Sequence, residues 1–271
     1  CIITYNLNLK GKSNYMRLHF IASEKQSARK ALKELLSTYI NFPLIDADII
    51  VVLGGDGTML QILHKVLSNP KFKDKRIFGL NRGSVGFLMN KYNTHNLEER
   101  IDNAFCEMIS PLRMTATDVD GKKVSTLAVN EVSLLRQSHQ AAKIRIYVDG
   151  KIRIKQLICD GVMLATPAGS TAYNFSAQGA ILPLESSLLA LTPVSPFRPR
   201  RWNGAILNDN SKVRFDILEE HKRPVNVSAD MQEIKSVTSI NIEMAYELKA
   251  KILFDNDFSW NDRILLEQFK H

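Results

Sequence analysis

The first half of the chain alternates short apolar runs with stretches of helical periodicity. Apolar runs at residues 18–22, 49–53 and 77–80 have the length of strands. The second run has no polar alternation, which predicts a strand buried on both faces of a mostly parallel sheet. Two helices are expected after the first and second runs, the second beginning near Thr58. Their apolar faces comprise Ala28, Ala31, Leu32, Leu35, Leu36 and Tyr39, and then Met59, Leu60, Leu63 and Leu67. The pattern predicts an α/β domain over residues 16–111.

Beyond residue 112 the helical period gives way to alternation at period two. Residues 144–154 are typical of a hairpin, because Asp149-Gly150 suits a tight turn with positive φ. Several short strands with turn signals predict a β-sandwich domain over residues 112–256. The further strands are expected at residues 132–135, 213–218, 225–229, 237–244 and 251–254.

The two ends of the chain are less strongly patterned. Residues 1–15 are expected to be an extension or a cloning remnant, and they are assigned no function. Residues 264–269 indicate a short helix. It lies in a C-terminal segment, residues 257–271, that we expect to return to the first domain.

Composition narrows the class of protein without identifying it. The net charge of +8 suits an anionic ligand such as a nucleotide. The patch Arg198, Arg200 and Arg201 is interpreted as a solvated surface or a subunit contact rather than a nucleic-acid site. Three widely spaced cysteines show neither a disulfide framework nor a metal-binding pair, which favours a reducing cytoplasm. No apolar run reaches the roughly 20 residues of a membrane helix. We therefore expect a cytoplasmic protein without nucleic-acid or membrane partners.

The most informative motif is Gly-Gly-Asp-Gly-Thr-Met-Leu, residues 54–60, directly after the buried strand. Glycines allow backbone N–H groups to approach a phosphate, and the following helix N-terminus favours negative charge. Gly54 and Gly55 are therefore candidates for a phosphate loop. Asp56 is a carboxylate and needs a hydroxyl or a metal ion as its partner, which indicates phosphoryl transfer. A second glycine loop, residues 81–86, follows the next strand, so both loops lie where open α/β sheets bind ligands.

A second cluster of polar groups lies in the β-rich half, at residues 159–173. An apolar strand here leads into a Pro-Gly turn and a dense set of hydroxyls. Ser170 or Thr171 could simply cap the next helix. The combination of these two capping candidates with Tyr173 and Asp160 around one loop favours a ligand site instead. Asn130-Glu131, before the strand at 132–135, is by itself an ordinary turn.

Taken in order, these segments resemble the NAD kinase family, which converts NAD to NADP. The matching strings are GGDGTML, NRGSVGFL, an Asn-Glu pair before a strand, and DGVMLATPAGSTAYNFSAQGAI. The first string also occurs in lipid kinases of the diacylglycerol kinase type, whereas the TPAGSTAY block is more specific. The resemblance covers residues 48 to about 197.

The resemblance implies a Rossmann-like α/β domain followed by a β-sandwich domain, with the dinucleotide between them, in a homodimer or homotetramer. It implies that Asp56 is catalytic and that Gly57 belongs to the nucleotide loop. The other residues implied to bind NAD are Asn130, Glu131, Asp160, Thr171, Ala172, Tyr173, Asn174, Ser176 and Gln232. No residue of the chain is assigned as a metal ligand.

The expected reaction moves the terminal phosphoryl group of ATP, or of polyphosphate, to the adenosine 2′-hydroxyl of NAD. Phosphoryl transfer depends mainly on alignment and charge neutralisation, so Asp56 is expected to orient the hydroxyl and take its proton late. A divalent ion, Mg²⁺ by preference, is expected to bridge the donor phosphates. Two alternatives remain open: a lipid kinase of the diacylglycerol kinase-like class, and a non-catalytic protein that senses nucleotides or binds nucleic acid.

Overall fold

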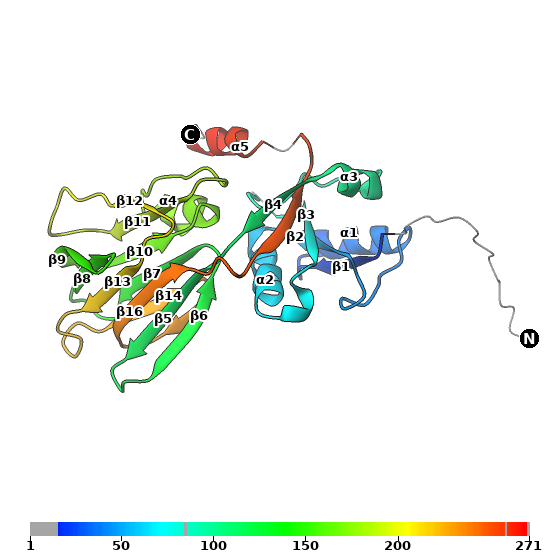
Figure 1. Cartoon of the computed structure of the whole chain (residues 1–271). Coiled ribbons are helices and arrows are strands. Elements are labelled where there is room, and N and C mark those ends of the chain that lie inside the picture. The colour runs from blue at the N-terminus through cyan, green and yellow to red at the C-terminus, as the bar shows by residue number, and fades with distance from the viewer. Residues whose placement is uncertain (1–15, 84–85, 258, 270–271) are drawn as a thin grey trace, which may run out of the picture.

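The computed structural model describes residues 16–83, 86–257 and 259–269. Figure 1 shows an α/β part and a β-rich part side by side, with the C-terminal helix above them. The predicted extension, residues 1–15, and part of the second glycine loop, residues 84–85, lie outside the described residues. No described helix is long and apolar enough to cross a membrane.

The α/β part is built on one five-stranded sheet with the order β1-β2-β3-β17-β4. The first four strands in this order run parallel, and β4 is antiparallel to β17. Their bounds are β1 Leu18–Ala22, β2 Ile49–Gly54, β3 Arg76–Asn81, β17 Ala250–Phe254 and β4 Phe105–Ile109. The sequence pattern places the strand at 251–254 in the β-rich half. In the structure it lies in the first sheet, because the chain returns there after the sandwich and pairs with β3.

Helices cover the sheet as the apolar pattern predicts. Every residue of β2 is buried, and successive side chains enter different apolar clusters: Ile50 packs with α2, whereas Val51 packs with α1. The helices are α1 Gln26–Leu36, α2 Asp56–Leu67 and α3 Leu97–Asn103, with the 3₁₀ turn η1 at Pro70–Phe72. Helix α2 begins at Asp56, two residues before the predicted start near Thr58. Asp56 is therefore itself the first helical residue.

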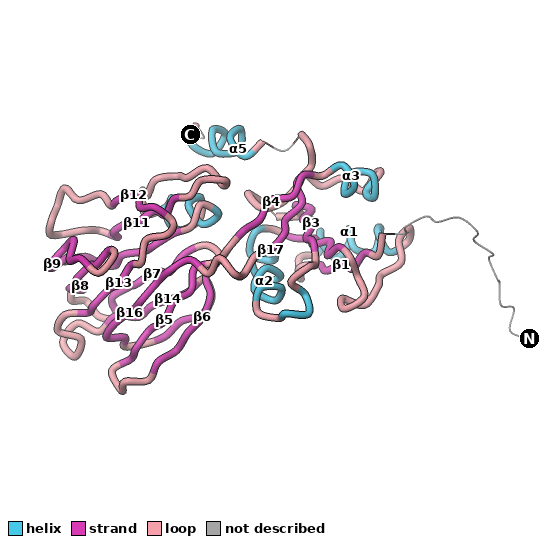
Figure 2. The backbone as a smooth tube through the Cα atoms, viewed as in Figure 1, coloured by secondary structure: helices cyan, strands magenta, loops and turns pink. Residues whose placement is uncertain are grey.

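The β-rich part is a sandwich of two six-stranded antiparallel sheets (Figure 2). One sheet has the order β12-β11-β10-β7-β14-β15, and the other β6-β5-β16-β13-β8-β9. Apolar residues from both sheets form one buried cluster that includes Leu134, Leu164, Phe215 and Ile240. The strands are β5 Leu112–Asp118, β6 Lys123–Ala128, β7 Glu131–Arg136, β8 Ala142–Val148, β9 Lys151–Cys159, β10 Gly161–Ala165, β11 Leu188–Val194, β12 Ala205–Asn208, β13 Val213–Ile217, β14 Val225–Ala229, β15 Gln232–Ile234 and β16 Val237–Met244.

Local turn chemistry acts as expected in the sandwich. The predicted hairpin is formed by β8 and β9, and both Asp149 and Gly150 have positive φ. The fold class predicted from the sequence, a Rossmann-like α/β unit with a β-sandwich, is confirmed. The remaining elements are the 3₁₀ turn η2 Ala168–Thr171 and the helices α4 Tyr173–Ser176 and α5 Trp260–Gln268.

Candidate functional site

The first glycine loop, residues 54–57, joins β2 to α2 and is tightly packed at its first residue, Gly54. A Cβ atom on Gly54 would lie 2.5 Å from the Thr58 hydroxyl oxygen, so only glycine fits there. Gly55 is the N-cap of α2 and has extended backbone. Gly57 differs, because a Cβ added there meets nothing within 4 Å. The space beside Gly57 is open to a ligand at the N-terminus of the helix, where backbone N–H groups favour an anion.

The second glycine loop packs directly on the first. The Arg82 N–H donates to the Gly54 carbonyl at 2.6 Å, and a Cβ on Gly83 would lie 3.2 Å from the Gly55 Cα. Since β2 and β3 are parallel neighbours, both loops leave the same edge of the sheet. The expectation that the two loops lie together at the carboxyl edge is confirmed.

The Asp56 carboxylate is held by the chain beyond the second loop. Its two oxygens accept hydrogen bonds from the N–H groups of Phe87 at 2.8 Å and Leu88 at 2.9 Å. Burial raises the pKa of Asp56, and the two N–H groups and the charge of Arg263 oppose that rise. The sequence suggested that this carboxylate needs a hydroxyl or a metal as its partner. Backbone amides supply part of that need and fix the orientation of the side chain.

The Asn130-Glu131 turn is organised by a residue from a distant segment, Asp230. The buried Asp230 carboxylate accepts the N–H groups of Val129, Asn130 and Glu131 at 2.6, 2.9 and 3.2 Å. It also bonds to Nε2 of His64 in α2 at 2.6 Å. Asp230 has a φ of +49°, and it forms the turn between β14 and β15. The turn is therefore more than the ordinary turn that its two residues alone indicate.

Glu131 carries an unusual carboxyl group. The residue is only 9% exposed, and its Oε2 has no hydrogen-bond partner among the described residues. Burial first, and the nearby Asp230 second, raise the pKa of Glu131 to about 7. A buried carboxyl with a free oxygen has the character of a ligand-binding group, because such an oxygen is costly unless something bonds to it.

The 166–176 segment packs on this turn. The Thr166 hydroxyl donates to the Val129 carbonyl at 2.7 Å, and a Cβ on Gly169 would lie 2.1 Å from the Asn130 carbonyl oxygen. Ala168 and Val129 join the apolar cluster that contains the buried face of α2. The Asn130 turn, the Pro-Gly turn and α2 are thus one packed unit.

The predicted residues after this turn fall into two groups. Thr171 and Ala172 are partly exposed, and Tyr173 and Ser176 are exposed, so all four are accessible to a ligand. Asn174 is fully buried. Its amide nitrogen donates to the carbonyls of Ser170 and Ala180, and its oxygen accepts from the Thr192 hydroxyl. The Asn174 side chain therefore holds this loop together, and it is not exposed to a ligand.

Asp160 and Gln232 lie at different distances from the Asn130 turn. Asp160 precedes β10, whose other end pairs with Glu131, so a strand length of roughly 15 Å separates the two. Asp160 instead pairs with Arg136, 2.6 Å from its Nε. The structure therefore does not bring Asp160 to the Asn130 turn within one chain. Gln232 begins β15, two residues after Asp230, and accepts a hydrogen bond from Thr126.

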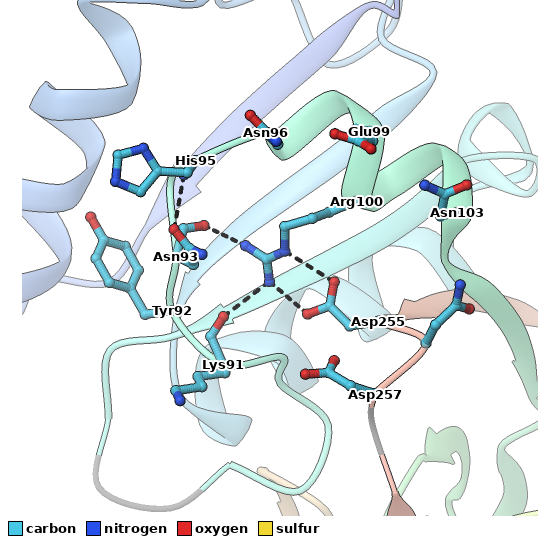
Figure 3. Close-up of a pocket in the computed structure, with 11 residues that line it drawn as sticks. Lys91, Tyr92, Asn93, His95, Asn96, Glu99, Arg100, Asn103, Asp255 and Asp257 are labelled. Carbon is cyan, nitrogen blue, oxygen red and sulfur yellow. Dashed lines mark hydrogen bonds and ion pairs between the residues drawn. The ribbon is translucent and has the colours of Figure 1, made fainter.

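A cavity of about 640 Å³ lies between α3 and residues 255–257 (Figure 3). Its central cation, Arg100, is fully engaged: it pairs with Asp255 at 2.6 Å and donates to the carbonyls of Lys91 and Asn93. The lining also contains the carboxylates of Glu99 and Asp257. Three carboxylates in this lining face the cations Lys91 and Arg100, and Arg100 is already paired, so the lining does not favour phosphate groups.

Reasoning from the sequence missed Asp230, His64 and Arg263. A signal for Asp230 existed in its position directly after the strand at 225–229, where a turn residue with positive φ is required. No local signal distinguishes His64 or Arg263, because their partners are distant in the sequence.

Comparison with family models gives two matches that together cover most of the chain. The ATP-NAD kinase N-terminal domain matches residues 4–106, and the ATP-NAD kinase C-terminal domain matches residues 129–253. An NAD kinase of Brucella suis biovar 1 (strain 1330) is 56% identical over 260 residues, covering 96% of this chain and 100% of that protein. An NAD kinase of Rhizobium meliloti (strain 1021) is 56% identical over 94% of this chain and 97% of its own length.

Two solved structures are similar over nearly the whole chain. An NAD kinase from Archaeoglobus fulgidus in complex with ATP has a TM-score of 0.70 at 28% identity, covering 89% of this chain and 94% of that chain. Yeast NADH kinase complexed with NADH has a TM-score of 0.79 at 21% identity, covering 94% and 88%. At that identity the yeast enzyme supports the fold alone.

Proposed function

The chain belongs to the NAD kinase family, and on that basis we propose that it transfers the terminal phosphoryl group of ATP to NAD. It is therefore a phosphotransferase. The acceptor in this proposal is the adenosine 2′-hydroxyl, and the product is NADP. The observation that carries the proposal is the Asp56 carboxylate, fixed by two backbone N–H groups beside two packed glycine loops.

Asp56 acts on the acceptor. A carboxylate has about four lone-pair positions, so after accepting two N–H groups it can still accept the proton of a hydroxyl. Burial raises its pKa, which makes it a stronger base than an exposed aspartate. In a loose phosphoryl-transfer transition state the proton leaves late, so the main work of Asp56 is to hold the hydroxyl in line.

The donor phosphates bind at the Gly54 to Gly57 loop. The open space beside Gly57 and the helix N-terminus support this assignment. The Archaeoglobus fulgidus relative was solved in complex with ATP, which supports ATP as the donor. Polyphosphate could bind the same loop, because its repeating unit presents the same oxygens.

A divalent ion fits the donor rather than a protein cage. No group of three or more His, Cys, Asp or Glu side chains within the described ranges could hold a metal ion. Mg²⁺ commonly keeps several waters and binds through substrate phosphates with one or two carboxylates. Asp56 is the carboxylate nearest the phosphate loop that could assist. When bound, the ion would neutralise charge on the transferred phosphoryl group.

NAD occupies the side of α2 that carries the Asn130 turn. Asp56 and His64 lie eight residues apart on α2, about 12 Å along the axis, and His64 bonds to the residue that shapes the turn. An extended dinucleotide can span such a distance. Asn130 and Glu131 contact the adenosine moiety, while Thr171, Ala172, Tyr173 and Ser176 line the pocket and Tyr173 offers its ring to a base. Asn174 shapes the pocket through its buried bonds, and Gln232 lies at its edge.

Asp160 gives a physical reason to expect a homodimer or homotetramer. Within one chain it is a strand length from the Asn130 turn. It can share that pocket only if a second copy of the chain supplies it. We propose that this assembly works in the cytoplasm, where the cysteines stay reduced.

One assay tests the proposal against its alternatives. The purified protein is incubated with ATP, Mg²⁺ and NAD, and NADP is followed with an NADP-specific dehydrogenase. Parallel reactions offer diacylglycerol as the acceptor and polyphosphate as the donor. NADP formation by the wild type and its loss in Asp56→Asn is expected. Phosphorylation of diacylglycerol without NADP, or NAD binding without turnover, would refute the proposal.

A further inference from the structure

The C-terminal helix α5 docks on the segment that holds Asp56. The Ser259 hydroxyl accepts the Asp262 N–H at 3.0 Å, which starts the helix as an N-cap. Trp260 is 5% exposed and meets the ring of Phe87 edge to face, with 5.9 Å between ring centroids. Met89 belongs to the same apolar cluster as Trp260. Helix α5 is therefore anchored at residues 86–89, although more than 170 residues separate the two segments.

Arg263, one turn along α5, binds the backbone of the same segment. Its Nη1 donates to the carbonyl of Met89 at 2.6 Å and to the carbonyl of Gly86. Between these two carbonyls lie the N–H groups of Phe87 and Leu88, both of which donate to Asp56. One guanidinium nitrogen thus bonds the carbonyls on both flanks of the two residues whose N–H groups hold Asp56. A Cβ on Gly86 would lie 2.9 Å from the Cβ of Met89, so the turn is already tight.

The charge of Arg263 also reaches the carboxylate. Burial lowers the pKa of Arg263, and attraction to Asp56, Asp255 and Asp257 opposes that change. In return, Arg263 lowers the pKa of Asp56 against the effect of burial. The positive charge of Arg263 thus offsets part of the effect of burial on Asp56.

We propose that Arg263 is a positioning residue for Asp56, holding residues 86–89 so that two backbone N–H groups orient the carboxylate. The inference rests on the proposed function, because it assumes that Asp56 orients the acceptor hydroxyl. The physical reason is preorganisation: donors fixed before the reaction need no rearrangement as charge develops. An arginine suits this task because its long side chain carries a permanent charge and its Nη1 has two N–H donors, one for each carbonyl.

The test compares Arg263→Met and Arg263→Lys with the control Arg17→Met. Arg17 is an exposed arginine that pairs with Asp48 before β2, at the amino edge of the sheet. Each protein is assayed for kcat, KM for NAD, the pH profile of kcat, and Tm. A misplacement of about 1 Å can cost about 100-fold in rate. We therefore expect Arg263→Met to lower kcat by about 10- to 100-fold, with KM for NAD and Tm little changed.

The pH profile separates positioning from a purely structural role. Without the cation the ionised form of Asp56 loses a favourable interaction, so its pKa rises. The acidic limb of the kcat profile should then move to higher pH in Arg263→Met. Arg263→Lys keeps the charge, but its ammonium lies one bond closer to the backbone than Nη1, so both carbonyl bonds should be weakened. The acidic limb of the kcat profile of Arg263→Lys should stay at the wild-type pH. The kcat of this variant should lie between those of the wild type and Arg263→Met.

Several outcomes would overturn the inference. Wild-type kcat and an unmoved acidic limb in Arg263→Met would do so, as would a fall in kcat that merely follows a fall in Tm. If Arg263→Met does not fold, Arg263→Lys decides, and wild-type kcat in that variant refutes the role. Asp56→Asn is measured alongside. If Asp56→Asn is inactive and the Arg263 variants are normal, only this inference fails; if Asp56→Asn is fully active, the proposed function of Asp56 fails.

Discussion

His64 in α2 and Asp230 in the turn between β14 and β15 are joined by a 2.6 Å hydrogen bond across the two halves of the molecule. The same carboxylate caps three consecutive backbone N–H groups at the Asn130 turn. This arrangement couples the helix that begins at Asp56 to the turn that is proposed to bind NAD. The coupling is made by side chains 166 residues apart.

Removing the Asp230 carboxylate should damage both stability and NAD binding. Asp230→Ala leaves three backbone donors without their acceptor, which should cost about 3 kcal/mol in free energy of unfolding. His64→Ala removes one bond and should cost about 1 kcal/mol. Denaturant unfolding and calorimetry with NAD measure both effects. Asp149→Ala, at another aspartate with positive φ in an exposed turn, is the control and should leave NAD affinity unchanged. Unchanged affinity in Asp230→Ala would contradict the coupling.

Asp56→Asn should abolish most of the activity and leave NAD binding intact. The amide cannot take a proton from the hydroxyl. Its NH₂ group is also a donor, so it cannot accept the hydrogen bond that one of the two backbone N–H groups donates to the carboxylate. We expect kcat to fall by about 10²- to 10⁴-fold, with the Kd for NAD within about twofold of wild type. Asp48→Asn is a matched control, because Asp48 lies at the opposite end of the same strand, β2. Near wild-type kcat in Asp56→Asn would rule out the proposed role.

Two glycine substitutions in the same loop should have opposite effects. Gly54→Ala places a Cβ 2.5 Å from the Thr58 hydroxyl oxygen, so Tm should fall. In Gly57→Ala the added Cβ meets nothing within 4 Å and lies in a helix. The free energy of unfolding should therefore stay the same or rise by up to about 1 kcal/mol, and Tm should not fall. If the donor phosphates bind beside Gly57, the new methyl group occupies their space, and the KM of Gly57→Ala for ATP should rise severalfold. An unchanged KM for ATP in Gly57→Ala would place the donor phosphates elsewhere.

Glu131 should make the stability of the free protein depend on pH. Its folded pKa, about 7, lies above its ordinary value of 4.5, so the folded state holds the proton more tightly. Between pH 4.5 and 7 stability should fall as pH rises, because the unfolded carboxyl ionises first. Glu131→Gln mimics the protonated group and lacks this contribution. The Tm of Glu131→Gln minus that of wild type should therefore grow from pH 5 to pH 8. A constant difference would contradict the raised pKa.

Much of the architecture could be predicted from local pattern. β1 has the bounds expected from its apolar run, and the hairpin at Asp149-Gly150 follows from turn chemistry. The sheet membership of β17 could not be predicted in this way. Its sequence fits either sheet, and only the pairing with β3, after an excursion of more than 160 residues, decides where it lies.

The candidate site divides along the same line. The sequence by itself determined that a glycine loop carrying Asp56 joins a buried strand to a helix, because glycine spacing and a strand-to-helix junction are local properties of the backbone. Only the tertiary structure decided what holds that carboxylate and what shapes the Asn130 turn. Phe87, Leu88, Arg263, Asp230 and His64 act through hydrogen bonds between segments far apart in the chain. Such bonds depend on how the layers pack against one another, so they cannot be predicted from the periodicity of apolar and polar residues along the chain.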